Sequence, residues 1–152
     1  MPTSFDFARA PGHLIRRAQQ IAVAEFTHAL ADLDITPVQF ALLNAVIDAP
    51  GMDQVTLAKT AAFDPATSGS VIARLEAKRW LRREADALDR RRKLLFVTPE
   101  GALAVEQMSA TVSQVQQNIL APLTAKDQAL FMALLHQLVS GHESPADPCA
   151  PS

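Results

Sequence analysis

The sequence predicts a mainly α-helical fold with a small β-hairpin, arranged as a winged helix-turn-helix with long helices at both ends. Three observations predict this fold. Two short helical segments separated by a tight turn occupy residues 54–79, which is the pattern of a helix-turn-helix. Two short strands around a charged turn follow directly, over residues 80–98. Long helical patterns lie on either side of this central part.

The N-terminal part of the chain predicts an irregular arm followed by a long helix. Residues 1–11 show no regular period and form the arm. Residues 12–33 predict the helix, because apolar and small side chains recur at helical spacing: Leu14, Ala18, Ile21, Ala22, Ala29 and Leu33.

A second helix is predicted over residues 36–49. Thr36 can cap its N-terminus, Pro37 fits its first position, and Gln39 stands where a capping box requires it. Pro50-Gly51 then ends the helix.

The remaining helices carry start signals of the same kind. Asp53 and Asp64 can cap the two short helices, residues 54–62 and 65–79. Thr98-Pro99 starts a long helix that runs to about Leu120. Thr124 starts the last helix, which the sequence predicts to end at Gly141. The chain therefore predicts a single domain over residues 12–141, with 36–98 as a central lobe and a disordered tail over 142–152.

Positive charge is concentrated in one segment. Residues 74–93 contain nine lysines and arginines and four acids, a charge of +5, whereas the rest of the chain carries five and twelve, a charge of −7. A basic block in an otherwise acidic chain with a net charge of −2 favours a polyanion at one surface. A solvated face with paired charges is the alternative reading of the same pattern.

The second helix of the helix-turn-helix has one small and basic face. Thr67, Ser70, Arg74 and Lys78 follow one another at steps of three and four. The small residues at its start, among them Ser68, would let the helix enter a major groove, where hydroxyl groups can bind base edges or phosphates. The alternative is a weak helix start that simply faces solvent.

The charged turn of the hairpin strengthens the first reading. Arg90, Arg91 and Arg92 crowd the turn, and like charges repel there unless an anion is bound. Guanidinium groups suit a narrow minor groove. Asp89 can shape the turn, either by accepting backbone hydrogen bonds or by pairing with Arg91. The partner predicted from both features is double-stranded DNA.

Three stretches resemble the MarR family of bacterial transcriptional regulators. They are LDITPVQFALLNAV, TLAKTAAFDPATSGSVIARLEAKRWLRR and DALDRRRKLLFVTPEG, and the resemblance covers about residues 14–138. The most specific piece is the wing, with Asp89-Arg90-Arg91 before an apolar strand and Val97-Thr98-Pro99-Glu100-Gly101 after it. The resemblance implies a homodimer with dimerisation helices at 12–33 and 99–141, a DNA-binding lobe at 36–98, and one operator half-site per subunit.

Two positions depart from the family pattern. Arg79 stands where the family usually has glycine after the recognition helix, and a side chain there costs roughly 1 kcal/mol in a left-handed conformation. We therefore expect a different exit from this helix. Ser70 stands where many members carry an arginine, which shifts the expected recognition toward the wing and DNA shape.

A ligand site is predicted on the first helix, since many MarR-like proteins release DNA when a small aromatic acid binds. His13, Arg16, Arg17 and Gln20 share one face, and an arginine pair beside a histidine suits a carboxylate. Phe7 and Phe40 could add ring contacts, and Asn44 a hydrogen bond. The segment is also similar to the first helix of MarR-type repressors of nicotinate breakdown, which respond to a hydroxynicotinate. The alternative is a solvated stripe or a dimer contact.

Other functions find little support in the sequence. Phosphate loops, nucleophile elbows and metal motifs are missing, so neither an enzyme nor a cofactor or metal is predicted. The single cysteine, Cys149, lies in the tail. Apolar runs are too short for a membrane span and no signal peptide is recognisable, which favours the cytoplasm. A winged helix used only for protein contacts, or a regulator without a small ligand, remains the alternative to a ligand-released repressor.

Overall fold

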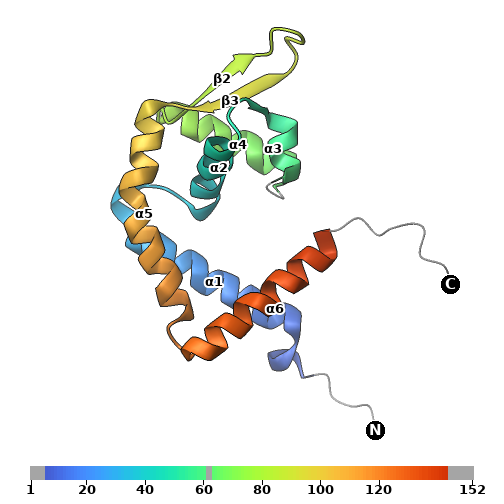
Figure 1. The fold of residues 1–152 in the computed structure, drawn as a ribbon, viewed down its shortest axis with the longest axis vertical. Helices are drawn as coiled ribbons and strands as arrows, with labels where there is room; N and C mark the ends of the chain where they lie inside the picture. Colours follow the sequence, from blue (N-terminus) through green and yellow to red (C-terminus); the bar gives the residue numbers. More distant parts are fainter. Residues whose placement is uncertain (1–5, 61–62, 144–152) are drawn as a thin grey trace, which may run out of the picture.

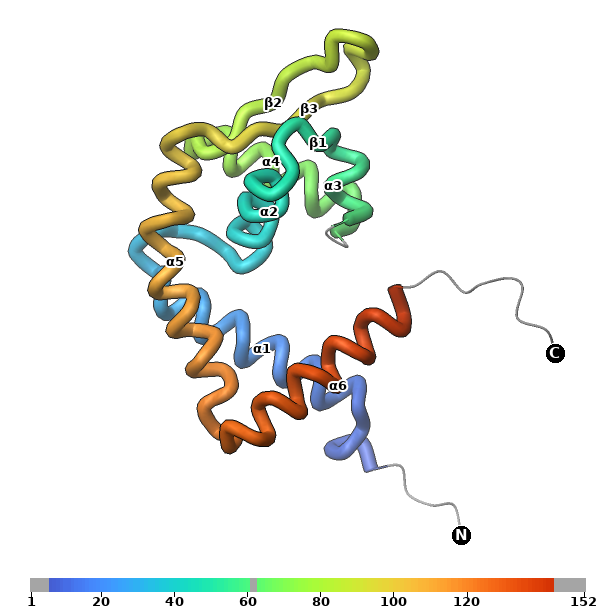
Figure 2. Tube along the Cα trace, in the orientation of Figure 1, coloured from blue at the N-terminus to red at the C-terminus, as the bar shows by residue number. Residues whose placement is uncertain are grey.

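The computed structural model describes residues 6–60 and 63–143 of the 152-residue chain. Figures 1 and 2 show a lobe of short helices and a hairpin standing on longer helices that carry both ends of the chain. The helices are α1 (Pro11–Ala29), α2 (Pro37–Asp48), α3 (Gln54–Thr60), α4 (Pro65–Ala77), α5 (Pro99–Leu120) and α6 (Ala125–Glu143). The strands are β1 (Met52–Asp53), β2 (Leu81–Ala85) and β3 (Lys93–Val97), and 3₁₀ turns cover Phe7–Arg9 and Ala31–Leu33.

The helices begin where the capping residues predicted them. Thr36 and Gln39 form a complete capping box at α2. The side chain of Asp64 accepts the backbone N–H of Thr67, and the Thr98 hydroxyl accepts that of Gly101. Each bond satisfies an N–H that the first helical turn leaves without a partner. The N-terminal ends of these helices are therefore determined by residues close to them in the sequence.

Some boundaries differ from the prediction. α1 ends at Ala29, because the chain turns so that both Leu30 and Ile35 enter the core, at 3% and 4% exposure. The arm contains a 3₁₀ turn, and α6 continues through Gly141 to Glu143. The predicted end of α3 at 61–62, the start of the arm and residues 144–152 of the predicted tail lie outside the described residues.

The hairpin is part of a three-stranded antiparallel sheet in the order β1-β3-β2. Leu81 pairs with Val97 across the hairpin, and Met52 pairs with Leu95 on the other side of β3. The sequence did not predict β1, because two residues are too few to show an alternating pattern. This strand joins the wing to the start of α3.

The structure also corrects the prediction made for the C-terminal end of α4. Arg79 has a φ of 61°, the left-handed conformation that glycine adopts in the family pattern, so the expectation of a different exit is wrong. Trp80 donates its N–H to the Leu75 carbonyl at 3.0 Å, and Arg79 donates to Glu76 at 2.9 Å. These two bonds form a Schellman motif, which satisfies the last carbonyls of the helix.

The wing base and the start of α5 pack tightly together. Thr98 donates its N–H to the Trp80 carbonyl at 3.0 Å and its hydroxyl to the Arg79 carbonyl at 2.6 Å. A Cβ on Gly101 would lie 2.1 Å from the Trp80 oxygen, so only glycine fits there. The segment Val97-Thr98-Pro99-Glu100-Gly101 thus fixes the direction in which α5 leaves the wing.

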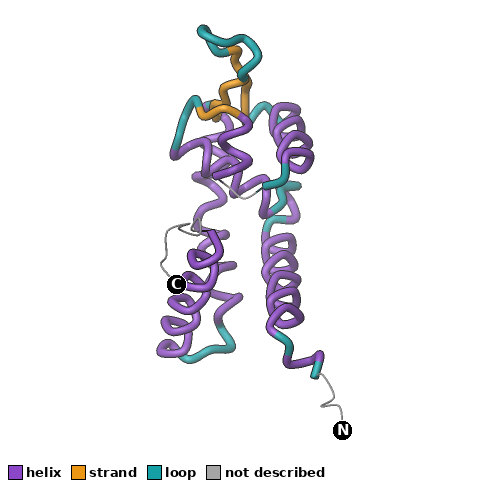
Figure 3. The backbone as a smooth tube through the Cα atoms, turned by 90° about the vertical axis from the view of Figure 1, so that its right-hand side faces the viewer, coloured by secondary structure: helices purple, strands orange, loops and turns teal. Residues whose placement is uncertain are grey.

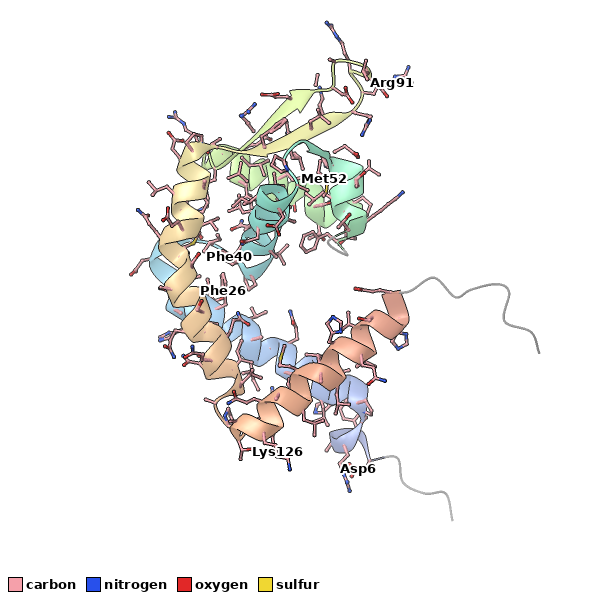
Figure 4. All side chains as sticks on the ribbon, in the orientation of Figure 1. Asp6, Phe26, Phe40, Met52, Arg91 and Lys126 are labelled. Carbon is pink, nitrogen blue, oxygen red and sulfur yellow. The ribbon has the colours of Figure 1, made fainter. Side chains whose placement is uncertain are left out.

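One hydrophobic core connects the lobe to the long helices. Its fully buried members include Leu42 and Val46 of α2, Ile72 of α4, Leu95 of β3 and Met108 of α5. The Phe26 and Phe40 rings lie 5.9 Å apart and carry the core to α1, as Figure 4 shows. The lobe and the upper parts of α1 and α5 therefore form one packed unit.

α6 is the exception, because it buries none of its side chains. Figure 3 shows it set apart from α1, although the two overlap in Figure 1. Its exposed apolar residues are Leu130, Phe131, Met132, Leu134, Leu138 and Val139. None of the helices in residues 6–60 and 63–143 has the length and apolar character that a membrane span requires.

Candidate nucleic-acid interface

The helix-turn-helix consists of α3 and α4, and aspartates fix both helix starts. Asp53 accepts the backbone N–H of Thr56 at 3.0 Å and its hydroxyl at 2.6 Å. Asp64 accepts the same two groups of Thr67. The threonine hydroxyls contribute most to a lowered pKa of both carboxyl groups, because a hydrogen bond to the charged form favours it.

α4 presents a face of small side chains to solvent. Thr67, Ser70 and Arg74 are exposed, together with Ala66, Ala73 and Ala77. The Ser70 hydroxyl donates to the Thr67 carbonyl at 2.9 Å, while its oxygen stays accessible. A face this shallow can approach the bases of a major groove closely. Ala66 belongs to the small-residue start that the sequence predicted for this face, whereas Ala73 and Ala77 were not predicted, because alanine carries no chemical signal in a sequence.

Ser68 does not belong to this face, and its prediction as a DNA contact is wrong. The side chain is 1% exposed, and its hydroxyl donates to the Asp64 and Pro65 carbonyls at 3.0 and 3.2 Å. It lies one position along the helix from Thr67, which turns it by about 100° toward the core.

Lys78 also points elsewhere than predicted. Its Nζ donates to the Leu33 carbonyl at 3.2 Å, lies 3.5 Å from an Asp34 carboxylate oxygen and stands over the Trp80 ring at 5.0 Å. These partners, on the α1–α2 connection and the wing base, orient the ammonium group away from the outer face of α4. The predicted phosphate contact therefore does not fit this geometry.

The wing tip has a defined backbone shape. Asp89 accepts the backbone N–H of Arg91 at 3.0 Å, which is the first of the two interactions predicted for it. Asp86 accepts the N–H of Leu88 at 2.9 Å, and the Asp86 and Arg92 backbones are bonded at 3.0 Å. Asp89 thus shapes the turn without forming an ion pair with the neighbouring Arg90 or Arg91.

Arg92 has a structural role that the sequence did not reveal. Its guanidinium binds Asp53 at 3.0 Å and Asp86 at 3.4 Å, and the bond to Asp53 raises the pKa of Arg92. The predicted minor-groove contact is therefore not supported for this arginine. Asp53 was predicted only as a helix cap, because nothing in the sequence places it beside a residue 39 positions further along.

Four of the nine cations in the basic segment are paired, and the pairing leaves the others unneutralised. Arg82 pairs with Glu84 and Arg83 with Glu76, in addition to Lys78 and Arg92. The five cations of the segment that have no ion-pair partner among the described residues are Arg74, Arg79, Arg90, Arg91 and Lys93. Figure 4 shows Arg91 at the far end of the wing, directed away from the helices. Positive charge is thus left free along α4 and the wing.

The residues predicted to bind a ligand do not come together in one chain. Arg17 donates to Gln20 at 3.0 Å, and the Phe7 and His13 rings lie 4.5 Å apart. Phe40 instead contacts Phe26, about 15 Å further along α1 than Arg16 at the usual helical rise.

The second residue predicted on α2, Asn44, is engaged within its own helix, because its side chain donates to the Phe40 carbonyl at 2.8 Å. The predicted ligand set therefore divides into an α1 group and an α2 group. The described residues contain no cluster of three or more His, Cys, Asp or Glu side chains that could hold a metal ion.

A helix-turn-helix with an accessible second helix and a cationic wing defines a DNA-binding transcriptional regulator of the winged-helix class. A family model described as the MarR family matches residues 33–92. Transcriptional regulator HosA of Escherichia coli is 34% identical over 128 residues, which cover 84% of this chain and 93% of HosA. The chain belongs to the MarR family, as its motifs predicted.

Two further similarities concern regulation by small molecules. The HTH-type transcriptional repressor NicR of Pseudomonas putida is 29% identical over 142 residues, covering 93% of this chain and 90% of NicR. The structure of Bordetella bronchiseptica BpsR, solved to explain regulation of its DNA binding by 6-hydroxynicotinic acid, is 34% identical with a TM-score of 0.83. The match covers 89% of this chain and 96% of that one.

Proposed function

We propose that the protein is a cytoplasmic, dimeric repressor that binds a pseudo-palindromic operator and is released from it by a small aromatic acid such as a hydroxynicotinate. The observation that carries the DNA-binding mode is the pair of unneutralised arginines, Arg90 and Arg91, on a hydrogen-bonded wing tip beside the exposed face of α4. Their charges meet no carboxylate among the described residues, so a polyanion is their natural partner.

The two parts of this interface take different grooves. α4 enters the major groove, where Thr67 and Ser70 reach base edges or phosphates and Arg74 adds a charge-assisted contact. The wing lies over the adjacent minor groove, where Arg90 and Arg91 meet the enhanced negative potential. Since α4 carries little base-reading chemistry, the wing and DNA shape contribute much of the recognition.

The long helices form the dimer. α6 exposes a run of apolar side chains that no other part of residues 6–60 and 63–143 covers, and α1 exposes Leu14, Ile15, Ile21 and Val23. Covering these faces with the same helices of a second copy places two α4 helices on one side of the dimer. Each subunit then reads one half-site, and the two-fold symmetry of the dimer matches a pseudo-palindrome.

The ligand carboxylate binds the polar stripe of α1. Arg16 and Arg17 offer guanidinium groups, Gln20 positions Arg17, and His13 presents a ring with one nitrogen, Nδ1, buried without a partner in the described residues. The similarity to BpsR and NicR supports an aromatic acid of the hydroxynicotinate type. Phe40 and Asn44 of α2 belong to this site only through a second subunit, because in one chain they lie too far from Arg16.

Release follows from a shift between two dimer geometries. In one geometry the spacing of the two α4 helices matches the operator, and in the other it does not. A ligand that binds more tightly to the second geometry weakens operator binding by up to the ratio of its affinities for the two geometries. The same linkage requires that operator DNA weakens ligand binding by the same factor.

Substitution of one wing arginine tests the DNA-binding mode. Arg91→Ala removes a cation from the wing tip, so we expect affinity for a palindromic fragment from upstream of the gene to fall about tenfold, with a salt slope lower by about 0.9. Fluorescence anisotropy titrations over a series of salt concentrations measure both quantities.

The control is Lys126→Ala, which makes the same change in net charge at the opposite end of the molecule (Figure 4). We expect this variant to bind like the wild type. Equal binding by Arg91→Ala and Lys126→Ala would show that the wing does not contact DNA.

A further inference from the structure

The wing tip carries one large apolar side chain in full contact with solvent. Leu88 is 97% exposed, and the next most exposed large hydrophobic among the described residues, Val55, is at 64%. Most of the others lie on α1, α5 and α6, where a second copy would cover them. The turn between β2 and β3, which contains Leu88, lies far from those helices, at the end of the molecule that carries Arg91 (Figures 1 and 4).

The backbone holds Leu88 in this position. Its own N–H is bound by the Asp86 side chain at 2.9 Å, and the Arg92 N–H by the Asp89 carbonyl at 2.9 Å. A leucine in a loose loop would fold back onto nearby apolar surface, because burial of its side chain is favourable. These bonds prevent that movement, so the side chain is presented outward before any partner arrives.

The wing tip is also fixed to the rest of the lobe. Arg92 bridges Asp86 of the tip and Asp53 at the start of α3, at 3.4 and 3.0 Å. Asp53 in turn caps α3 and lies in the strand that pairs with β3. Arg92 therefore connects the tip that carries Leu88 to the start of the helix-turn-helix.

We propose that Leu88 is an apolar wedge that enters the minor groove beside the two wing arginines. This inference rests on the proposed function, in which the wing lies over that groove. The walls of a minor groove are deoxyribose rings, which offer an apolar surface, and architectural proteins insert leucine between base steps of this same groove. Leu88 packs against these rings and excludes water around Arg90 and Arg91, which strengthens their interaction with the phosphates.

The wedge also selects sequence. A G·C pair places the guanine 2-amino group in the minor groove, whereas an A·T pair presents only acceptors. The amino group occupies the space that an apolar side chain would fill, and a leucine gives it no hydrogen-bond acceptor. Leu88 therefore disfavours G·C pairs under the wing, at positions where the α4 face makes no contact.

The test compares Leu88→Ser with Leu88→Met in the full-length protein. Serine removes the apolar contact without changing charge, so we expect binding to fall about tenfold at every salt concentration, with the salt slope of the wild type. Methionine keeps an apolar side chain of similar size and should bind like the wild type. Circular dichroism confirms that both variants are folded, and anisotropy titrations measure affinity and slope.

Inosine substitution tests the selection. Replacing guanine by inosine in the segments that flank the half-sites removes the 2-amino group, which should improve binding by the wild type more than by Leu88→Ser. Equal improvement, or a Leu88→Ser variant that binds like the wild type, overturns the wedge.

If the proposed DNA-binding function itself is wrong, the experiments give a different result. In that case the wild type shows no salt-dependent binding, or Arg91→Ala binds like Lys126→Ala. An intact Arg91 effect with no Leu88 effect overturns the wedge alone.

Discussion

Arg79 adopts a left-handed backbone conformation, with a φ of 61°, at the point where α4 ends. For a residue with a Cβ this conformation costs on the order of 1–2 kcal/mol, whereas glycine adopts it freely. The surrounding structure enforces it, because Trp80 must return to bond Leu75 while Thr98 binds the Arg79 carbonyl. Arg79 thus stores strain next to the recognition helix.

Relief of this strain should stabilise the protein. Arg79→Gly keeps every backbone hydrogen bond and removes the Cβ clash, so we expect the free energy of unfolding to rise by about 1 kcal/mol. Urea denaturation measures it. Ala77→Gly is the control, because a glycine inside the exposed face of α4 should lower the same free energy by about 1 kcal/mol. A loss of stability in Arg79→Gly would show that the left-handed conformation is not strained.

Side chains that bond to a nearby backbone group were predictable from the sequence, whereas the conformation of Arg79 was not. The Asp64 cap and the Asp89 turn were predictable, because each bonds a backbone group two or three residues away. The exit at Arg79 was not, since local preference argued against it and contacts with Thr98 decided it. Ser68 was misassigned for a related reason, as its burial depends on the packing of α4 and not on its own chemistry.

At the scale of elements, the wing is held to the helix-turn-helix by the contact between Asp53 and Arg92. Hydrogen bonds from Thr56, followed by the one from Arg92, lower the pKa of Asp53 from its ordinary value of 3.8. A carboxyl group with a lowered pKa in the folded state contributes stability above its unfolded pKa. That contribution is lost as the pH falls through the folded pKa.

This contact predicts a specific pH dependence. Asp53→Asn keeps a side chain that can cap α3 but removes the charge, so its unfolding free energy should lack the Asp53 contribution. We expect the difference between wild type and variant to be largest above pH 3.8 and to shrink as the solution becomes more acidic. Urea denaturation in a series of buffers measures it. A difference that stays constant across the series would contradict the role of the charge.

Helices and strands long enough to show a hydrophobic periodicity were predictable from the sequence. Elements that are very short, or that depend on distant contacts, were not. All six helices and both hairpin strands follow from periodicity and caps. β1 did not, because its two residues become a strand only when β3 lies beside them. The end of α1 moved because Leu30 and Ile35 both had to reach the core.

At the level of the whole molecule, the ligand site proposed on α1 and the proposed DNA-binding surface of α4 and the wing lie at opposite ends. α5 runs from the wing base toward α6, and Lys78 connects the recognition helix to the α1–α2 connection. A change in how the dimer helices pack is therefore carried to α4 through contacts that already exist. The sequence predicted candidate residues at both ends, and those predicted for the ligand divide between α1 and α2 in a single chain.

Substitution of Arg16 tests the proposed ligand site on α1. Arg16→Ala removes one guanidinium from the α1 stripe, so we expect 6-hydroxynicotinic acid to release DNA only at about tenfold higher concentration, with operator affinity unchanged in its absence. Mobility shifts with increasing acid measure the midpoint of release, and Lys126→Ala serves again as the charge-matched control. Undiminished release from Arg16→Ala would place the ligand elsewhere.

The uncovered apolar face of α6 has a consequence for gene dosage. In the proposed dimeric repressor, two chains must meet before either can read an operator, so occupancy depends on the square of the chain concentration whenever single chains predominate. A twofold fall in copy number then lowers the amount of dimer about fourfold. A cell that halves expression of such a repressor would relieve repression far more than in proportion, which gives the regulated genes a threshold response even without inducer.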